Sequence, residues 1–128
     1  MRTPEQVVRA FCAEVSSRDA STVRELFHPD AVFHDPPKQP QRGREEVLSG
    51  LAAIFTRFEV VTFEIRHLAA AGEVVLTERV DWLGTKERAA PVPVMGTFEI
   101  RDGLIHQWRD YFDQNFATAL IQGDQPAG

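Results

Sequence analysis

The sequence predicts an α+β fold in which a curved antiparallel meander sheet wraps around three N-terminal helices and leaves a cone-shaped pocket. Apolar residues recur at helical spacing up to Arg57, whereas from Phe58 onward they alternate with a period of two. Turn signals separate the alternating segments, the strongest being the hairpin sequence Asp102-Gly103. Helices followed by antiparallel strands are typical of one helical layer on one sheet, and the open end of such a curved sheet is a natural small-molecule site.

Three helices are expected in the first half of the chain. The segment Thr3-Pro4-Glu5-Gln6 has the form of a helix start, because threonine can cap, proline suits the first helical position and glutamine completes a capping box. Apolar spacing then predicts a helix over residues 4–17. Asp19 can cap a short second helix that ends at His28-Pro29, and the apolar side of residues 44–57 predicts the third.

The strands are expected mainly after the third helix. A short extended piece over residues 31–35 stops at Pro36-Pro37 and leads into a proline-rich loop that ends at Gly43. Alternation or enrichment in β-branched and aromatic residues predicts four further strands over residues 58–69, 73–83, about 91–100 and 104–112. We expect one domain over residues 1–122 and a flexible tail over residues 123–128.

Composition excludes several classes of function. The 128 residues carry a formal net charge of −5 with no basic stripe among aromatics, so no nucleic-acid partner is expected. The longest weakly charged run, residues 89–100, is too short for a membrane span and holds two prolines. The N-terminus has no apolar signal-like stretch, which predicts a cytoplasmic location. Cys12 is the one cysteine, and no histidine pair has ligand spacing with a carboxylate, so neither metal nor cofactor is expected.

Charged residues interrupt two of the predicted strands. Arg79 and Asp81 lie on one face of their strand, about 7 Å apart, between the apolar Val75 and Leu83. A surface ion pair accounts for this alternation as well as a buried one does. The last strand repeats the pattern, because Asp110 shares a predicted face with four apolar or aromatic neighbours, Leu104, His106, Trp108 and Phe112. Large apolar residues on both faces favour the inward orientation.

An inward orientation has a chemical consequence. An isolated buried charge costs several kcal/mol, so these groups must be paired or protonated. The fork of Arg79 can donate to Asp81 and Asp110 at once. Desolvation and mutual repulsion then favour one shared proton, which makes one carboxyl group an acid and the other a base near neutral pH.

Three segments resemble a known enzyme family: Thr77-Glu78-Arg79-Val80-Asp81, Gly96-Thr97-Phe98-Glu99 and Trp108-Arg109-Asp110-Tyr111-Phe112-Asp113. They are similar to the limonene-1,2-epoxide hydrolases, a SnoaL-like family within the cystatin-like, nuclear transport factor 2-like superfold. The resemblance covers nearly the whole chain. It implies that Asp110 is the base that activates water, Asp81 the acid that protonates the epoxide oxygen and Arg79 the bridge between them. It also implies direct hydration without covalent ester, metal or cofactor, and a homodimer.

The chain departs from that family where the nucleophilic water is held. The family uses a tyrosine and an asparagine two residues apart, and Phe33 and Asp35 stand at these water-positioning places. Phenylalanine has no hydroxyl group to contact the water, whereas an ionised aspartate can accept but not donate a hydrogen bond. The substrate, or the reaction, can therefore differ from that of the family.

Two other functions are open on the sequence. The segment 30–36 also resembles the ketosteroid isomerase branch of the superfold, in which Asp35 would be the base of an isomerase or a polyketide cyclase. Against that reading, Phe11 and Gly96 stand where the branch has its oxyanion donors, so an enolate would be poorly stabilised. The third possibility is a non-catalytic pocket for a hydrophobic ligand, because the superfold has many functions.

Apolar side chains are expected to shape the pocket and to favour a small apolar epoxide as substrate. His106 is expected to be a hydrogen-bonded pocket histidine rather than a catalytic group, and Trp108 is expected to be a core and interface residue rather than a stacking platform. The candidates for the lining are Phe55, Phe58, Phe63, Val75, Leu83, Met95, His106, Trp108 and Phe112.

Overall fold

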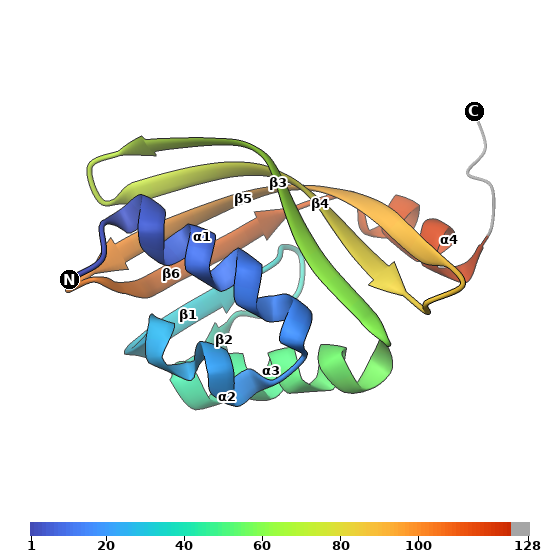
Figure 1. Cartoon of the computed structure of the whole chain (residues 1–128), viewed down its shortest axis with the longest axis horizontal. Helices are drawn as coiled ribbons and strands as arrows, with labels where there is room; N and C mark the ends of the chain where they lie inside the picture. Colours follow the sequence, from blue (N-terminus) through green and yellow to red (C-terminus); the bar gives the residue numbers. More distant parts are fainter. Residues whose placement is uncertain (124–128) are drawn as a thin grey trace.

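The computed structural model describes residues 1–123, which form four α-helices and one sheet (Figure 1). The helices are α1 (Pro4–Glu14), α2 (Ala20–Val23), α3 (Arg44–Arg57) and α4 (Gln114–Gln122), with 3-10 turns at Val15–Ser17 and Arg24–Leu26. The strands are β1 (Phe27–His34), β2 (Gln41–Arg42), β3 (Val60–Ala71), β4 (Val74–Gly84), β5 (Ala89–Arg101) and β6 (Leu104–Tyr111).

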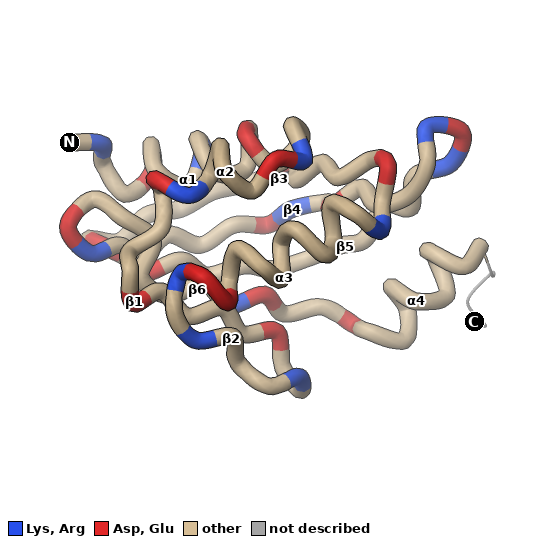
Figure 2. Tube along the Cα trace, turned by 90° about the horizontal axis from the view of Figure 1, so that it is seen from below, with Lys and Arg blue, Asp and Glu red and all other residues tan. Residues whose placement is uncertain are grey.

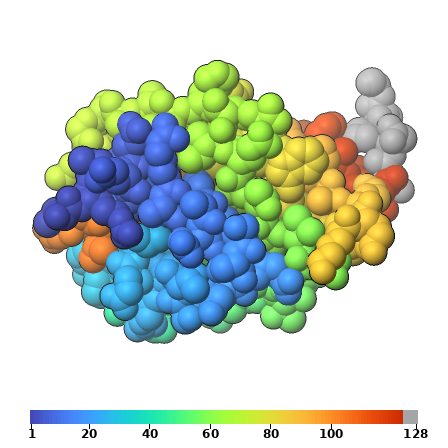
Figure 3. Space-filling view, viewed as in Figure 1, coloured from blue at the N-terminus to red at the C-terminus, as the bar shows by residue number. Residues whose placement is uncertain are grey.

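The six strands form one curved sheet in the order β2-β1-β6-β5-β4-β3. Strands β3 to β6 are an antiparallel meander, while β1 pairs parallel to β6 and antiparallel to β2. Helix α1 lies across the concave side of this sheet, with α2 and α3 beside it (Figure 1). In the space-filling view the N-terminal part of the chain covers much of this face (Figure 3). The predicted α+β class with a curved sheet around N-terminal helices is confirmed, and β1 covers most of the predicted extended piece over residues 31–35. The short strand β2 and the parallel pairing of β1 with β6 were not predicted.

The predicted start of the first helix is confirmed in detail. The Thr3 hydroxyl accepts from the backbone N–H of Gln6 while the Gln6 side chain accepts from the backbone N–H of Thr3, and Pro4 opens the helix. The second helix is shorter than predicted, since β1 begins at Phe27. Phe27 is buried and pairs with Ile105 of β6, so packing between distant segments overrides the local helical spacing.

Helix α4 was not predicted, although start and stop signals are present. The Asp113 side chain accepts from the backbone N–H of Phe116, and Gly123 ends the helix in the left-handed conformation that glycine adopts at low cost. Its buried Ala117 packs against Val92 and Val94 of β5. The helix stands at the end of the sheet away from the N-terminus (Figure 2). Of the predicted tail, residues 124–128 lie outside the described residues.

The core lies between α1 and the sheet. Phe11 is fully buried and makes edge-on contacts with the rings of Phe27, Phe63, Phe98 and Trp108. Each such side chain contributes about 1.5–3 kcal/mol of apolar burial. Charged positions gather at turns and edges, but some lie along β4 within the sheet (Figure 2). No helix in the described part of the chain is long and apolar enough to span a membrane.

Candidate active site

Arg79 of β4 lies buried between two aspartates. Its side chain is 1% exposed and is the largest fully buried side chain in the described structure. Its Nε and Nη2 donate to Oδ1 and Oδ2 of Asp81, at 3.0 and 2.9 Å. Its Nη1 and Nη2 donate to Oδ1 and Oδ2 of Asp110, at 3.1 and 2.9 Å. One guanidinium thus holds two carboxylates in fork-to-fork geometry, which is the strong form of this contact.

Strand register brings these groups together. On β4 the alternation places Thr77, Arg79 and Asp81 on the inner face, and Thr77 lies opposite Gly96 of β5. Gly96 lies in turn opposite Asp110 of β6, so five inward positions meet across three neighbouring strands. The order of the strands therefore places the β6 carboxylate within reach of an arginine on β4.

Gly96 provides the space that this geometry needs. A Cβ atom at this position would collide with Nη1 of Arg79 and would stand 2.6 Å from Oδ1 of Asp110. Any other residue would therefore occupy the space through which the arginine reaches across β5. This glycine is the position that allows the two carboxylates to share one guanidinium.

Replacing Gly96 with alanine should therefore disrupt the site. We expect the free energy of unfolding to fall by about 1–3 kcal/mol, the cost of overpacking. We also expect the rate of epoxide hydration, the reaction that the sequence resemblance implies, to fall by more than the change in stability explains. Urea unfolding and kcat measured on the same samples test this prediction. Thr97→Ala is the matched control, because its side chain leaves the opposite face of the sheet. Full activity in Gly96→Ala would show that the arginine does not need this space.

Further side chains hold the three groups in place. The Thr77 hydroxyl accepts from Nη1 of Arg79 at 3.2 Å and donates to the carbonyl of Gly96. Trp108 donates its indole N–H to Oδ1 of Asp110 at 2.9 Å. The guanidinium also lies over the ring of Phe63, 4.8 Å from its centroid. Sequence reasoning missed these contacts, although Thr77 stands two residues before Arg79 and so had to share its face.

Burial and charge set the proton affinities of this group. Burial raises the pKa of Asp81 to about 6, while Arg79 opposes this rise and the charge of Asp110 adds to it. Burial by itself would lower the pKa of Arg79, but Asp110 and Asp81 raise it by more, so the guanidinium stays charged. Asp81 can therefore carry a proton near neutral pH while it remains hydrogen-bonded.

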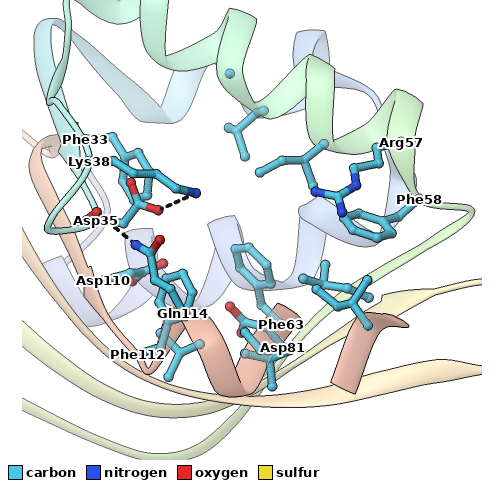
Figure 4. A pocket seen from close by; sticks show the side chains of 18 of the residues that line it. Phe33, Asp35, Lys38, Arg57, Phe58, Phe63, Asp81, Asp110, Phe112 and Gln114 are labelled. Carbon is cyan, nitrogen blue, oxygen red and sulfur yellow. Dashed lines mark hydrogen bonds and ion pairs between the residues drawn. The ribbon is translucent and has the colours of Figure 1, made fainter. Parts of the chain in front are cut away.

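A cavity of about 220 Å³ opens beside these carboxylates (Figure 4). Asp81 and Asp110 line it, whereas Arg79 lies behind them and is not among the lining residues. Its volume is below the ~300–1,000 Å³ typical of sites for drug-sized ligands, so it suits a small molecule. The walls are mostly apolar and include Leu51, Ile54, Phe58, Phe63, Leu83, Val92, Val94, Trp108, Phe112, Ala117 and Ile121. Helix α4, which was not predicted from the sequence, therefore forms part of the cavity wall.

Four of the predicted lining residues lie elsewhere. Phe55 and Val75 are both buried in the core. Helix α3 turns Phe55 toward the core, whereas Ile54 and the residue after the helix, Phe58, face the cavity. Met95 is 53% exposed, since alternation on β5 sends it to the outer face of the sheet while Val94 faces inward. The predictions for these three side chains were wrong.

The fourth is His106. The register between β5 and β6 shifts at this point, so that Ile100 pairs with Ile105 and Glu99 with Gln107, and one extra residue lies in β6. The bulge turns Ile105 into the core, and His106 instead packs edge-on against His28 with ring centroids 5.1 Å apart. The prediction that His106 lines the pocket and shares a face with Asp110 was wrong for this reason.

Phe33 and Asp35 both line the cavity at the end of β1 (Figure 4). The ring of Phe33 packs on Trp108, with centroids 4.1 Å apart. A carboxylate oxygen of Asp35 lies 3.4 Å from Nζ of Lys38, and Gln114 of α4 donates to the carbonyls of Asp35 and Pro36. In the described residues, no cluster of histidine, cysteine or acidic side chains is arranged to hold a metal ion.

Several known proteins are similar to this chain in sequence, in fold, or in both. The family model of the SnoaL-like domain matches residues 8–108. The epoxide hydrolase EphG of Mycobacterium tuberculosis is 35% identical over 119 residues, which are 91% of this chain and 78% of that protein. A solved LEH-like epoxide hydrolase from M. tuberculosis is 32% identical, with a TM-score of 0.75 over 91% of this chain and 88% of that one.

A hypothetical protein of ketosteroid isomerase-like fold from Catenulispora acidiphila superposes with a TM-score of 0.83, over 97% of this chain and 96% of that one. At 24% identity this second likeness shows the fold alone. The family model, by contrast, covers most of the chain, including the β4 arginine–aspartate pair. The chain therefore belongs to the SnoaL-like domain family and has the nuclear transport factor 2-like fold.

Proposed function

We propose that this protein hydrolyses a small apolar epoxide by adding water to it in one concerted acid–base step. The observation that carries the proposal is the pair of carboxylates, Asp81 and Asp110, that face one apolar cavity and share one buried guanidinium. The 35% identity with a protein named an epoxide hydrolase supports the same reaction.

Each group has a distinct task in this reaction. Asp110 accepts a proton from water as the water oxygen bonds to an epoxide carbon. As the carbon–oxygen bond of the ring breaks, Asp81 donates its proton to the leaving oxygen, and a diol results. Each positioned proton transfer contributes on the order of 10²–10⁴ in rate. The proton then returns from Asp110 to Asp81 through solvent, which restores the starting state.

Arg79 and the end of β1 prepare the reactants. The guanidinium fixes both carboxylates and keeps them apart, so neither must reorganise during the reaction. Asp35 can accept a hydrogen bond from the attacking water, while Phe33 gives that water an apolar wall. The apolar lining excludes bulk water and selects an apolar substrate.

Oxygen labelling in a single turnover tests the proposal. With enzyme in excess over an epoxide in ¹⁸O-water, the diol should contain one heavy oxygen and the protein none, because no ester of an aspartate forms. Label retained in the protein would overturn the one-step reaction.

An isomerase or cyclase that uses Asp35 is the second candidate, favoured because the Asp35 carboxylate faces the same cavity. Phe11, however, lies in the core and Gly96 has no side chain, so neither offers an oxyanion donor. The composition of the product separates the two, since hydration adds one water molecule to the substrate and an isomerisation adds none.

The pH dependence should follow Asp81. Its pKa is raised to about 6 by burial, and the acid must be protonated to donate. We therefore expect kcat/KM, corrected for uncatalysed hydrolysis, to fall about tenfold per pH unit above about pH 6. A rate that stays level well above that pH would remove Asp81 from the role of acid.

Phe33→Tyr should raise the hydration rate. A hydroxyl group at this position can donate to or accept from the attacking water, which the phenylalanine ring cannot do. We expect kcat to rise by about tenfold, the effect of one hydrogen bond of about 1.4 kcal/mol in the transition state. Phe112→Tyr, which adds a hydroxyl group elsewhere on the cavity wall, is the control. A lower rate in Phe33→Tyr alone would argue against water positioning at this residue.

A further inference from the structure

Two cationic side chains, Lys38 and Arg57, lie on opposite sides of the cavity (Figure 4). Lys38 already has a partner, because its Nζ lies 3.4 Å from the carboxylate of Asp35. Arg57, in the last turn of α3, has no carboxylate within ion-pair distance among the described residues. Its guanidinium lies over the ring of Phe58, 4.7 Å from the centroid, and Phe58 is itself a lining residue.

Acidic and basic side chains occupy different parts of the cavity lining. The acidic groups Asp81 and Asp110 are held by Arg79 in the inner wall, and Asp35 is paired with Lys38. Arg57 is exposed and lines the cavity on the side opposite Lys38 and Asp35. An anionic group would be repelled by the acidic wall and attracted by the unpaired guanidinium.

We infer that the substrate is an apolar epoxide that carries one carboxylate, which Arg57 binds while the epoxide ring reaches Asp81 and Asp110. This inference rests on the proposed function and names its substrate class. A guanidinium can hold a carboxylate with two parallel hydrogen bonds, and the contact with Phe58 keeps it oriented. The apolar walls between the two polar ends suit a short alkyl chain. Arg57 thus determines both the specificity and the direction in which the substrate enters.

A binding experiment with an unreactive probe isolates the anion site. Octanoate and octanamide share an alkyl chain, so calorimetry on the two compares the charge alone. We expect wild-type protein to bind octanoate about tenfold more tightly than octanamide, and Arg57→Met to lose that preference. Arg57→Lys should retain part of it, because the charge remains without the fork. Arg9→Met is the matched control, since Arg9 lies on α1 and pairs with Glu5.

A kinetic experiment then tests the substrate class. The probes are an octanoic acid with a terminal epoxide and its methyl ester. The ratio of kcat/KM for acid over ester should be about ten in wild type, near one in Arg57→Met and unchanged in Arg9→Met. Equal binding of octanoate and octanamide by wild type would overturn the inference. It would also be overturned if Arg57→Met lowered Tm but kept the preference for octanoate over octanamide and for the acid over the ester.

The two proposals fail separately. Octanoate preference without turnover of either epoxide would contradict epoxide hydrolysis and support the anion site. Turnover of acid and ester at equal rates, without octanoate preference, would support hydrolysis and overturn the role of Arg57.

Discussion

Asp110→Asn should abolish hydration while the protein stays folded. The amide keeps the size of the carboxylate and one oxygen that can accept from the Trp108 indole and from Nη1 of Arg79, while the hydrogen bond from Nη2 is lost. Arg79 keeps its two hydrogen bonds to Asp81, and the guanidinium is not left without a charge partner. An amide cannot take a proton from water near neutral pH, so we expect kcat to fall by about 10³.

Asp102→Asn is the matched control for this substitution. Asp102 occupies a turn with a φ of 53°, a conformation that asparagine adopts readily, and it lies outside the cavity lining. Circular dichroism and urea unfolding establish that both variants fold. An Asp110→Asn protein that retains more than about a tenth of the activity would show that another group activates the water.

Arg79→Ala should inactivate the protein and destabilise it. Removing the guanidinium leaves Asp81 and Asp110 buried without a cation, and breaking a buried ion pair in this way costs about 3–5 kcal/mol. The two carboxylates would then bind protons more tightly in the folded state than in the unfolded state. The stability of this variant should consequently increase as the pH falls, because the folded state gains protons.

Urea unfolding at about pH 5 and about pH 8 tests the sign of this dependence. Arg101→Ala, which removes an exposed arginine at the end of β5, should leave stability within about 0.5 kcal/mol at either pH. Arg79→Lys keeps the charge without the fork, so it should fold more stably than Arg79→Ala and remain impaired in turnover. A stable, active Arg79→Ala protein would mean that the guanidinium does not organise the site.

Local patterns were sufficient where a single segment decides its own structure. The capping residues around Thr3 determine where α1 begins, because the hydrogen bonds that they form lie within four residues of one another. Period-two alternation placed Arg79 and Asp81 on one face of β4, since neighbouring side chains of a strand must point to opposite sides. The Asp102-Gly103 hairpin follows from residues that adopt positive φ at low cost.

Sequence patterns gave wrong or incomplete predictions where the position of a side chain depends on the segment that packs against it. A bulge in β6 moved His106 off the face of Asp110, because the register against β5 shifts there. Phe55 lies on α3 and Phe58 directly follows the helix, and only the packing of the helix shows that Phe58, and not Phe55, borders the cavity. Helix α4 carries its own caps, yet its place as a cavity wall depends on contacts with β5.

The amino-acid sequence by itself determined the class of fold, the acidic and basic residue types, and the strand face on which each charge lies. Alternation alone did not distinguish a surface ion pair from a buried one. The tertiary structure decided that question, because β5 lies between β4 and β6 and its glycine lets Arg79 reach Asp110. The burial of Arg79, Asp81 and Asp110 removes water from these three groups, and it raises the pKa of Asp81 to about 6, so that this carboxyl group can hold a proton near neutral pH.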